Sequence, residues 1–543
     1  MRLAVASLFT LGLLASMLGA VVLGLLYATE AMSFPVVIGL VILINLLMWL
    51  AGPRFNDFLY DFLYDIHWMS LEDLRMKSEA SADVIESVCD EYGYDEPKLG
   101  LIHDSNPNAF TYGSGRWNSR VVVTEGIFEY LDDEEAASVI AHEMGHITHR
   151  DFIVMTIANT LVQLLYLVAT RAFKMASYMR SGNSKRNPAS FLVIIGIMSY
   201  VFYFIGQYLL YYLSRVREYY ADTFAAEQTD PDLLSSALLK VAYGIMISPD
   251  DHELVNATKA LGIMDVKSSK DRGMMYNNCE QRGDHEPIAK SFLFDLHNPW
   301  ATIVELNSTH PLTGKRIKEL SGMSSDPLFD FDRIERQYSV DTGRLYRQFG
   351  IDLLFVGLPI LATVLFPIIA GIAILRGIVS LDPTMLAGSW MGILGIAMMA
   401  KTYYKYPLGD EPEQSTVIDA MADIYASPVR GQMVELDGEL VGKGQAGYRF
   451  SEDLMFQDET GLMYLQYESW LPVFGNFLFS LGDVPELIGD KATVRGWFLR
   501  GMRPWIGLKG LETDDRTIDS YVFLGGLGLG GLLLGIGFLI TLL

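Results

Sequence analysis

Cysteine is nearly absent from this sequence: Cys89 and Cys279 are the two in a chain of 543 residues. They form no CxxC pair, so neither a disulfide framework nor a cysteine zinc site is expected. Basic residues are also scarce. Lys and Arg number 41 against 65 Asp and Glu, which gives a net charge of -24. This balance argues against sequence-independent nucleic-acid binding, which requires Lys and Arg to displace phosphate counterions.

Hydrophobic residues, by contrast, make up 50% of the chain and gather in long runs. The runs lie at residues 3–28, 34–51, 152–172, 190–213, 353–375, 385–400 and 521–543. A bilayer core needs about 20 apolar residues per helix, so we expect a mainly α-helical, multi-pass integral-membrane protein. An alternative for the first run is a secretory signal peptide, although the run exceeds the usual apolar segment of about 7–15 residues.

The runs and the polar regions between them predict the organisation of the chain. The predicted parts are two transmembrane helices at 1–51, a first catalytic part at 52–151, a transmembrane hairpin at 152–213, a second catalytic part at 214–350, a transmembrane pair at 351–403, an acidic β-rich domain at 404–519 and a C-terminal transmembrane helix at 520–543.

The β-rich region differs in kind from the rest of the chain. Short segments such as GQMVELDGELVGKG and KATVRGWFLRG are separated by Gly, Asp and Asn turns, which predicts a small β-barrel or sandwich. The phrase DETGLMYL resembles part of an OB-fold. Because residues 404–519 contain 20 acidic and 10 basic residues, oligonucleotide binding is not expected.

The first polar region leads into the most informative segment. RVVVTEGIFEYL, from Arg120, predicts a strand that runs into a helix, because Val121 to Val123 are β-branched and the alternation then stops. A second helix is predicted in LDDEEAASVIAHEMGHITHRD. Asp132, with Glu135 three residues later, forms the capping-box pattern that begins a helix.

That helix carries an HExxH motif at residues 142–146. Residues four apart share a helix face, so His142 and His146 can bind one tetrahedral zinc ion while Glu143 takes a proton from its water. The alternatives are two surface histidines on an ordinary amphipathic helix, or an inactive relative that has kept the fold.

A catalytic zinc site needs a third protein ligand. His142 and His146 precede the run at 152–172, and Glu218 follows the run at 190–213. If these two runs form an antiparallel hairpin, both ends emerge on one side of the membrane, and Glu218 becomes the candidate.

Asp222 lies one helical turn after Glu218 and can accept a hydrogen bond from a ligand imidazole, which would fix its tautomer. The alternative for Glu218 and Asp222 is a solvated helix face that pairs with Arg215 and Arg217.

Four motifs in one order, NAFTYG, HExxH followed by HRD, ExxAD and STHPLTGKRI, resemble the HtpX-like and CAAX prenyl protease family of integral-membrane zinc metallopeptidases. The resemblance covers roughly residues 1–325. It implies a gluzincin-like α+β catalytic domain at the membrane surface, with one catalytic Zn²⁺ on His142, His146 and Glu218 and with Glu143 as general base.

The resemblance also implies roles for residues around the ligands. The HRD motif places His149 and Arg150 near them, and the ExxAD motif does the same for Asp222. His310 in STHP would help to stabilise the oxyanion, and Arg316 would support its loop; the alternative for His310 is a loop-packing residue.

In this family, NAF lies on an edge strand that pairs with an extended substrate, which implies substrate binding at Asn108, Ala109 and Phe110. The alternative is that Asn108 and Gly113 simply mark turns. Beyond residue 325 the chain departs from the shorter HtpX pattern, and nothing there has a catalytic pattern. The GLGLGGLLLG stretch near residue 525 favours close helix packing, and the alternative is simply a permissive terminal helix.

The sequence therefore predicts a zinc endopeptidase that acts on membrane or membrane-proximal proteins in protein quality control. The alternatives are a specific processing protease of the CAAX type and an inactive membrane scaffold that presents the β-rich domain. The expected location is the cell membrane of a prokaryote. The count of Lys and Arg near the ends of the spans favours a cytoplasmic catalytic side.

Overall fold

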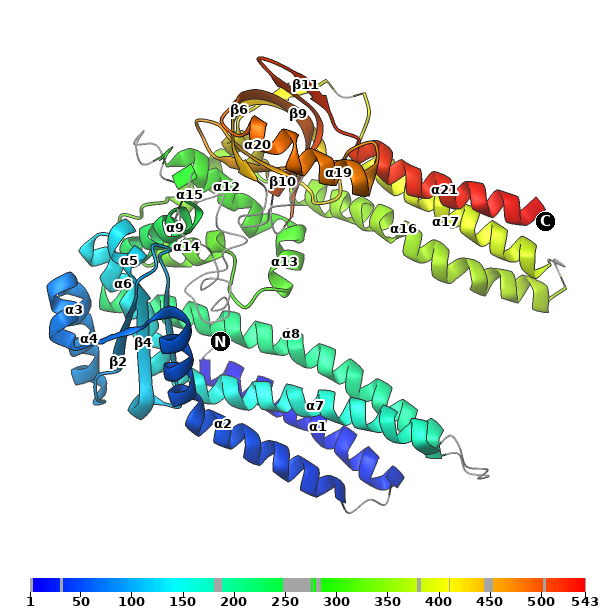
Figure 1. Cartoon of the computed structure of the whole chain (residues 1–543). Helices are drawn as coiled ribbons and strands as arrows, with labels where there is room; N and C mark the ends of the chain where they lie inside the picture. The colour runs from blue at the N-terminus through cyan, green and yellow to red at the C-terminus, as the bar shows by residue number, and fades with distance from the viewer. Residues whose placement is uncertain are drawn as a thin grey trace. The chain divides into compact units, whose positions relative to one another are not determined.

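The computed structural model describes residues 3–29, 33–179, 188–247, 275–276, 278–279, 285–377, 382–409, 411–443, 453–501 and 504–542. The chain forms two compact units, which are described separately below. The first contains residues 1–269 and 305–328, and the second contains residues 270–304 and 329–543. Figure 1 labels many of their helices and strands.

Four long helices lie in the described part of the first unit: α1 (Leu3–Thr29), α2 (Ser33–Tyr64), α7 (Asp151–Met179) and α8 (Pro188–Gln228). Helices α7 and α8 pack against each other and against α1 through buried aliphatic residues such as Leu18, Leu165 and Leu192. Their outer faces expose apolar side chains, including Ile194 and Ile197. This pattern is typical of helices whose outer surface lies in lipid.

A four-stranded sheet stands beside these helices in the order β1-β2-β4-β3. Its strands are β1 (His67–Met69), β2 (Lys98–Ile102), β3 (Ala109–Gly113) and β4 (Ser119–Thr124). Strands β2 and β4 are parallel, and the other pairs are antiparallel. The predicted strand at Val121 to Val123 is confirmed as β4, which is buried throughout because it lies inside the sheet. Strand β3 is an edge strand among the described residues.

The described residues of the first unit also form shorter helices. They are α3 (Leu71–Lys77), α4 (Glu79–Tyr92), α5 (Glu125–Tyr130), α6 (Asp133–Thr148), α9 (Pro231–Ile247) and α14 (Thr313–Ser321), with a 3-10 turn at Arg116–Asn118. The predicted start of α6 is confirmed: Asp132 accepts from the Glu135 backbone N–H, and the Glu135 carboxylate accepts from the Asp132 N–H. Helix α6 is buried in the core, against α4, α8 and α9.

The second unit contains three further long helices, α16 (Thr342–Leu375), α17 (Pro383–Lys405) and α21 (Val522–Leu542). Helices α17 and α21 pack closely at glycines: a Cβ atom on Gly395 would lie 2.5 Å from the Gly530 carbonyl oxygen, and one on Gly388 would lie 2.6 Å from that of Gly537. The predicted close packing of the glycine-rich last span is confirmed, since only Gly admits backbones this near. Smaller helices are α12 (Glu286–His297), α13 (Pro299–Leu306), which runs across the boundary between the units, and α15 (Phe331–Gln337).

The described part of the second unit also contains a β-barrel. It comprises β6 (Gln432–Lys443), β7 (Leu454–Gln457), β8 (Leu462–Gln466), β9 (Lys491–Arg500) and β10 (Pro504–Thr513), flanked by β5 (Glu413–Gln414), β11 (Thr517–Asp519), α18 (Val417–Met421), α19 (Pro472–Leu481) and α20 (Asp483–Leu487). The five barrel strands close a ring in the order β6-β7-β8-β10-β9-β6, with β8 and β10 parallel. A closed five-stranded barrel with its helices between the third and fourth strands has the arrangement of an OB-fold.

Five of the described helices are long and apolar enough to cross a membrane: α7, α8, α16, α17 and α21. Helix α16 is the clearest candidate for a membrane span, because no other part of the described structure buries its apolar segment. The two expected spans at the start of the sequence fall on α1 and α2, which have 27 and 32 residues. The chain is therefore a multi-pass membrane protein.

Candidate active site

The two histidines of the HExxH motif lie on the buried face of α6. His142 is fully buried, and His146 is half-buried four residues later. Their ring centroids are 4.9 Å apart with the ring planes nearly perpendicular. Because residues four apart share a helix face, both Nε2 atoms point to the same side of α6.

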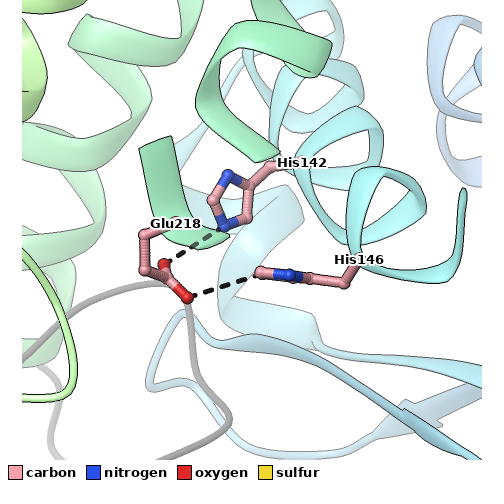
Figure 2. Close-up of side chains that lie close together, drawn as sticks. All are labelled: His142, His146 and Glu218. Carbon is pink, nitrogen blue, oxygen red and sulfur yellow. Dashed lines mark ion pairs between the residues drawn. The ribbon is translucent and has the colours of Figure 1, made fainter. Parts of the chain in front are cut away.

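Glu218, on α8, completes the group. Its Oε2 lies 3.6 Å from His142 Nε2, and its Oε1 lies 3.6 Å from His146 Nε2. Figure 2 shows the carboxylate facing both imidazoles. The three potential ligand atoms lie within 4.8 Å of one another. The structure thus brings together the three residues that the sequence predicted to be ligands.

Gly145 explains how α6 and α8 approach this closely. A Cβ atom at this position would lie 3.2 Å from Ala221 Cα and 3.2 Å from the Phe224 ring, both on α8. The glycine inside the HExxH motif therefore permits the helix contact that places Glu218 opposite the histidines.

Asp222 lies one turn after Glu218 and faces the other side of the His142 ring. Its Oδ1 lies 3.0 Å from His142 Nδ1. Arg316, which is 1% exposed, clamps the same carboxylate with two contacts: Nε to Oδ2 at 2.8 Å and Nη2 to Oδ1 at 2.6 Å. Arg316 therefore supports His142 through Asp222, a contact that the sequence did not predict.

His146 has a carboxylate partner of its own, which the sequence analysis missed. Asp151 Oδ2 lies 2.7 Å from His146 Nδ1. Arg217, beside Glu218 on α8, forms an ion pair with Asp151 and is almost fully buried. The HRD motif contains Asp151, but the resemblance had directed attention to His149 and Arg150 in the same motif.

Those two residues lie away from the ligand atoms. The His149 ring packs edge-on against Tyr220 and Phe224, with centroids 6.2 and 5.7 Å away. Arg150 is exposed and has a φ of 60°, a left-handed conformation that non-glycine residues rarely adopt. The turn at Arg150 directs the chain from α6 into α7 and brings Asp151 back toward His146.

Glu143 is on α6, and its side chain is buried on the side of the helix that faces strand β3. Its Oε2 accepts a hydrogen bond from the Thr111 hydroxyl, and its Oε1 has no hydrogen-bond partner among the described residues. Burial raises the pKa of the Glu143 carboxyl above its usual value, although both nearby imidazoles oppose this shift. Thr111 lies in the NAFTYG motif, but a hydroxyl reaching from a strand to the motif helix has no signature in the sequence.

His310 lies beside the same group. Its side chain is buried, and its Nε2 is 3.6 Å from Glu218 Oε2. The Thr309 hydroxyl is 3.1 Å from Nδ1, on the opposite side of the ring. His310 therefore presents Nε2 toward the candidate ligands.

The edge strand β3 passes in front of Glu143. Asn108 precedes the strand, while Ala109 and Phe110 begin it. The Thr124 N–H donates to the Asn108 carbonyl, so alternate peptide groups face β4 and the intervening ones, at Ala109 and Thr111, face the open edge. The side chains of Asn108, Ala109 and Phe110 are themselves buried.

The two imidazoles differ in their electrostatic surroundings. For His142, burial alone would lower the pKa, but the facing carboxylates of Asp222 and Glu218 outweigh it and raise the pKa to about 9. For His146, burial dominates and lowers the pKa despite the attraction of Glu218. The carboxylates around His142 therefore favour a positive charge at this point, and a bound cation would take the place of the His142 proton.

The residues present fit a zinc ion. Two imidazole nitrogens and one carboxylate are a donor set that Zn²⁺ accepts, and bonds of about 2.0–2.1 Å to a tetrahedral ion separate ligand atoms by about 3.4 Å. The observed separations of 3.6 Å agree with this spacing. His142 Nε2 and Glu218 Oε2 are also buried without a hydrogen-bond partner among the described residues. Such atoms are costly to bury unless something binds them.

Comparison with known proteins gives several matches. Residues 76–324 match Peptidase family M48. The chain is 30% identical over 282 residues to a protein named "Protease HtpX homolog" from Pyrobaculum aerophilum, covering 52% of this chain and 74% of the relative. It is 30% identical over 236 residues to a protein of the same name from Methanothermobacter thermautotrophicus, covering 41% and 86%. A solved structure, Ste24p from S. mikatae, is 17% identical and covers 56% of this chain and 62% of its own, with a TM-score of 0.34.

Proposed function

The chain belongs to peptidase family M48, as its motifs predicted, and from this premise we propose that it is a zinc-dependent endopeptidase of the membrane surface. One observation carries the proposal. His142, His146 and Glu218 converge from two helices, while the general-base candidate Glu143 lies between the two histidines in the sequence and is buried beside them.

In this proposal a single Zn²⁺ is held by His142, His146 and Glu218. When bound, the ion polarises the substrate carbonyl and lowers the pKa of a water molecule to about 7. Glu143 takes the proton from the water at its Oε1, and it later gives the proton to the leaving amine. Thr111 holds the other carboxylate oxygen, so Oε1 remains directed toward the reacting atoms.

The surrounding residues have distinct roles in the proposal. The carboxylates of Asp222 and Asp151 each lie on the Nδ1 side of one ligand imidazole, which leaves Nε2 to bind the metal. Arg316 and Arg217 neutralise these two carboxylates. His310 directs Nε2 toward the site and would donate a hydrogen bond to the oxyanion.

Substrate binding is proposed at the edge strand β3. An extended peptide that pairs with the open edge would use the peptide groups of Ala109 and Thr111, with Asn108 and Phe110 holding the strand to β4. Main-chain hydrogen bonds of this kind require little of the substrate sequence. They therefore suit an endopeptidase of broad specificity.

The location of the site favours substrates at the bilayer surface. Helix α6 ends at Thr148, and the membrane-spanning helix α7 begins at Asp151, which itself contacts His146. We propose that the protein cleaves membrane or membrane-proximal proteins in quality control, with the catalytic side in the cytoplasm of a prokaryotic cell.

The metal content of Glu218→Gln tests the proposal. Purified wild-type protein is expected to contain one zinc ion per chain, and the variant should lose most of it because a neutral amide is a poor zinc ligand. The matched control is Glu227→Gln, an exposed glutamate on the same helix, which should keep its zinc. Undiminished zinc in Glu218→Gln would remove the proposed third ligand, and chelator-resistant cleavage of casein by the wild type would contradict metal dependence.

A further inference from the structure

Helix α19 of the barrel domain carries an unusually apolar outer face. Six large apolar side chains are exposed on the helix and on the two residues before it, with Trp470 and Phe474 exposed to 70% and 65%. The others are Leu471, Phe477, Leu478 and Leu481. Phe474, Phe477, Leu478 and Leu481 recur at the spacing that defines one face of a helix.

The inner face of the same helix is the more polar one. Asn476 is buried, and its Oδ1 accepts a hydrogen bond from the Ser469 N–H at 2.7 Å. Ser480 is fully buried and donates to the Phe477 carbonyl. Phe479 is the exception, and it stacks on Tyr467 of the barrel at 3.8 Å. A helix in contact with water would place Phe and Leu inward and Asn and Ser outward. The arrangement in α19 is inverted.

This face is continuous with a membrane-spanning helix. The Trp470 ring packs edge-on against Tyr521, with centroids 5.7 Å apart, and Tyr521 immediately precedes α21. The Tyr521 N–H donates to the Glu468 carbonyl at 2.7 Å, and the Glu468 N–H donates to Ser520. The start of α19 is therefore fastened to the point where α21 leaves the barrel.

Aromatic and basic side chains lie at the ends of the neighbouring helices as well. The end of α17 lies beside the start of α21, because a Cβ atom on Gly526 would lie 2.6 Å from the Thr402 side chain. Lys405, the last residue of α17, lies over the Trp505 ring at 4.6 Å. Trp, Tyr and Lys at helix ends are typical of the interface between lipid and water.

We propose that α19 lies in the membrane interface, with Phe474 and Leu478 in the lipid, and that it holds the barrel against the bilayer beside α21. The partner is lipid rather than protein, because the face continues from a spanning helix and α19 contains no charged residue. Interfacial helices bury their apolar face about 5–10 Å into the boundary of the bilayer. This inference is independent of the peptidase activity.

Spin labels on the full-length chain in phosphatidylcholine nanodiscs test the proposal. Phe474→Cys and Leu478→Cys are the test variants, and Val441→Cys, on an exposed barrel residue beside acidic side chains, is the matched control. Leu365→Cys on α16 supplies the lipid-exposed reference. The unsubstituted chain keeps Cys89 and Cys279, which are both buried. Treating this chain with the spin label measures the background from these two residues.

Labels at residues 474 and 478 should be accessible to oxygen and shielded from a water-soluble nickel complex, as at residue 365, whereas the label at residue 441 should show the opposite pattern. Nickel accessibility at 474 and 478 equal to that at 441 would overturn the proposal. Shielding from both reagents would also overturn it, because it would mean that protein covers the face. Two labelled positions guard against a local effect of either substitution.

Discussion

Both units of the molecule bury charged side chains, but they satisfy them differently. In the first unit, His142, Glu143 and Glu218 each carry a buried atom that has no hydrogen-bond partner among the described residues. His142 and Glu143 are on α6 and Glu218 is on α8, and the ligand atoms of His142 and Glu218 converge with that of His146. The surrounding ion pairs of Asp222 and Asp151 are directed at the far sides of the imidazoles.

In the second unit, the buried carboxylate of Asp352 on α16 has hydrogen-bond partners on both of its oxygen atoms. It accepts hydrogen bonds from Trp300 Nε1 at 2.8 Å, from the Tyr404 hydroxyl at 2.6 Å and from the Ser427 hydroxyl at 2.7 Å. Arg500 likewise donates to the carbonyls of Met421 and Ser291. These contacts join helices to the barrel.

The difference separates two uses of buried charge. A buried charged side chain with a full set of hydrogen-bond partners stabilises the fold. Any substitution of such a side chain therefore lowers the stability of the protein. Buried groups that converge with unpaired atoms are costly for folding and are maintained for chemistry or binding. On this comparison, substitutions of the converging residues in the first unit and of their carboxylate partners should change activity or metal binding, and substitutions at Asp352 should change stability alone.

The largest effect is expected for Glu143→Gln. Removal of the general base should lower kcat by at least about 10²-fold, because proton transfer by a positioned group contributes about 10²–10⁴-fold. Zinc content should remain that of the wild type, since Glu143 is not a proposed ligand. Peptide hydrolysis and metal analysis of one preparation measure both quantities. Glu134→Gln, an exposed residue of the same helix, is the control, and full activity in Glu143→Gln would refute the role.

Asp151→Asn should weaken metal binding by about 10–100-fold, the usual effect of losing a partner of a ligand imidazole. The physical reason is that His146 loses the carboxylate that orients its ring. Competition with a chelator measures the affinity. The exposed Asp90→Asn serves as control. An unchanged affinity would show that the contact between Asp151 and His146 is structural only.

Asp352→Asn should reduce stability without changing metal affinity. An amide cannot accept all the hydrogen bonds that the carboxylate accepts, and a buried donor left unpaired costs about 1–3 kcal/mol. Denaturant unfolding in detergent, followed by tryptophan fluorescence, gives the loss. If the zinc affinity of this variant fell as far as that of Asp151→Asn, the distinction between the two units would not hold.

The smallest effect concerns pH. Burial, with smaller contributions from neighbouring cationic groups, lowers the pKa of His149 to about 4, whereas an unfolded histidine titrates near 6.5. Between these values the unfolded chain binds the additional proton, so stability falls as the pH drops from about 6.5 toward 4. His149→Phe keeps the contacts with Tyr220 and Phe224 but removes the titration, so its melting temperature should fall less steeply over this range.

The control for the pH experiment is His67→Gln, which changes an exposed histidine and should leave the slope of the wild type intact. A slope in His149→Phe equal to that of the wild type would assign the acid sensitivity to other groups.

Much of the fold followed from local pattern. The capping box at Asp132 and Glu135 predicted where α6 begins, and HExxH spacing predicted which helix face carries the imidazoles. Glu218 was reached by a topological argument, because two apolar runs that form a hairpin return the chain to the side where it entered. Turn residues and short β-rich segments predicted the barrel, but the order of its strands depends on pairings that no local pattern encodes.

The amino-acid sequence by itself predicted which three residues converge as candidate ligands, since helix period and membrane length are properties of neighbouring residues. Tertiary structure decided how those residues are held. Thr111 meets Glu143 across 32 positions, and Arg316 meets Asp222 across 94. In the HRD motif, the left-handed turn at Arg150 brings Asp151 to His146 and leaves Arg150 exposed. Such partners depend on how distant segments pack and on one backbone angle, and neither appears in the order of residues.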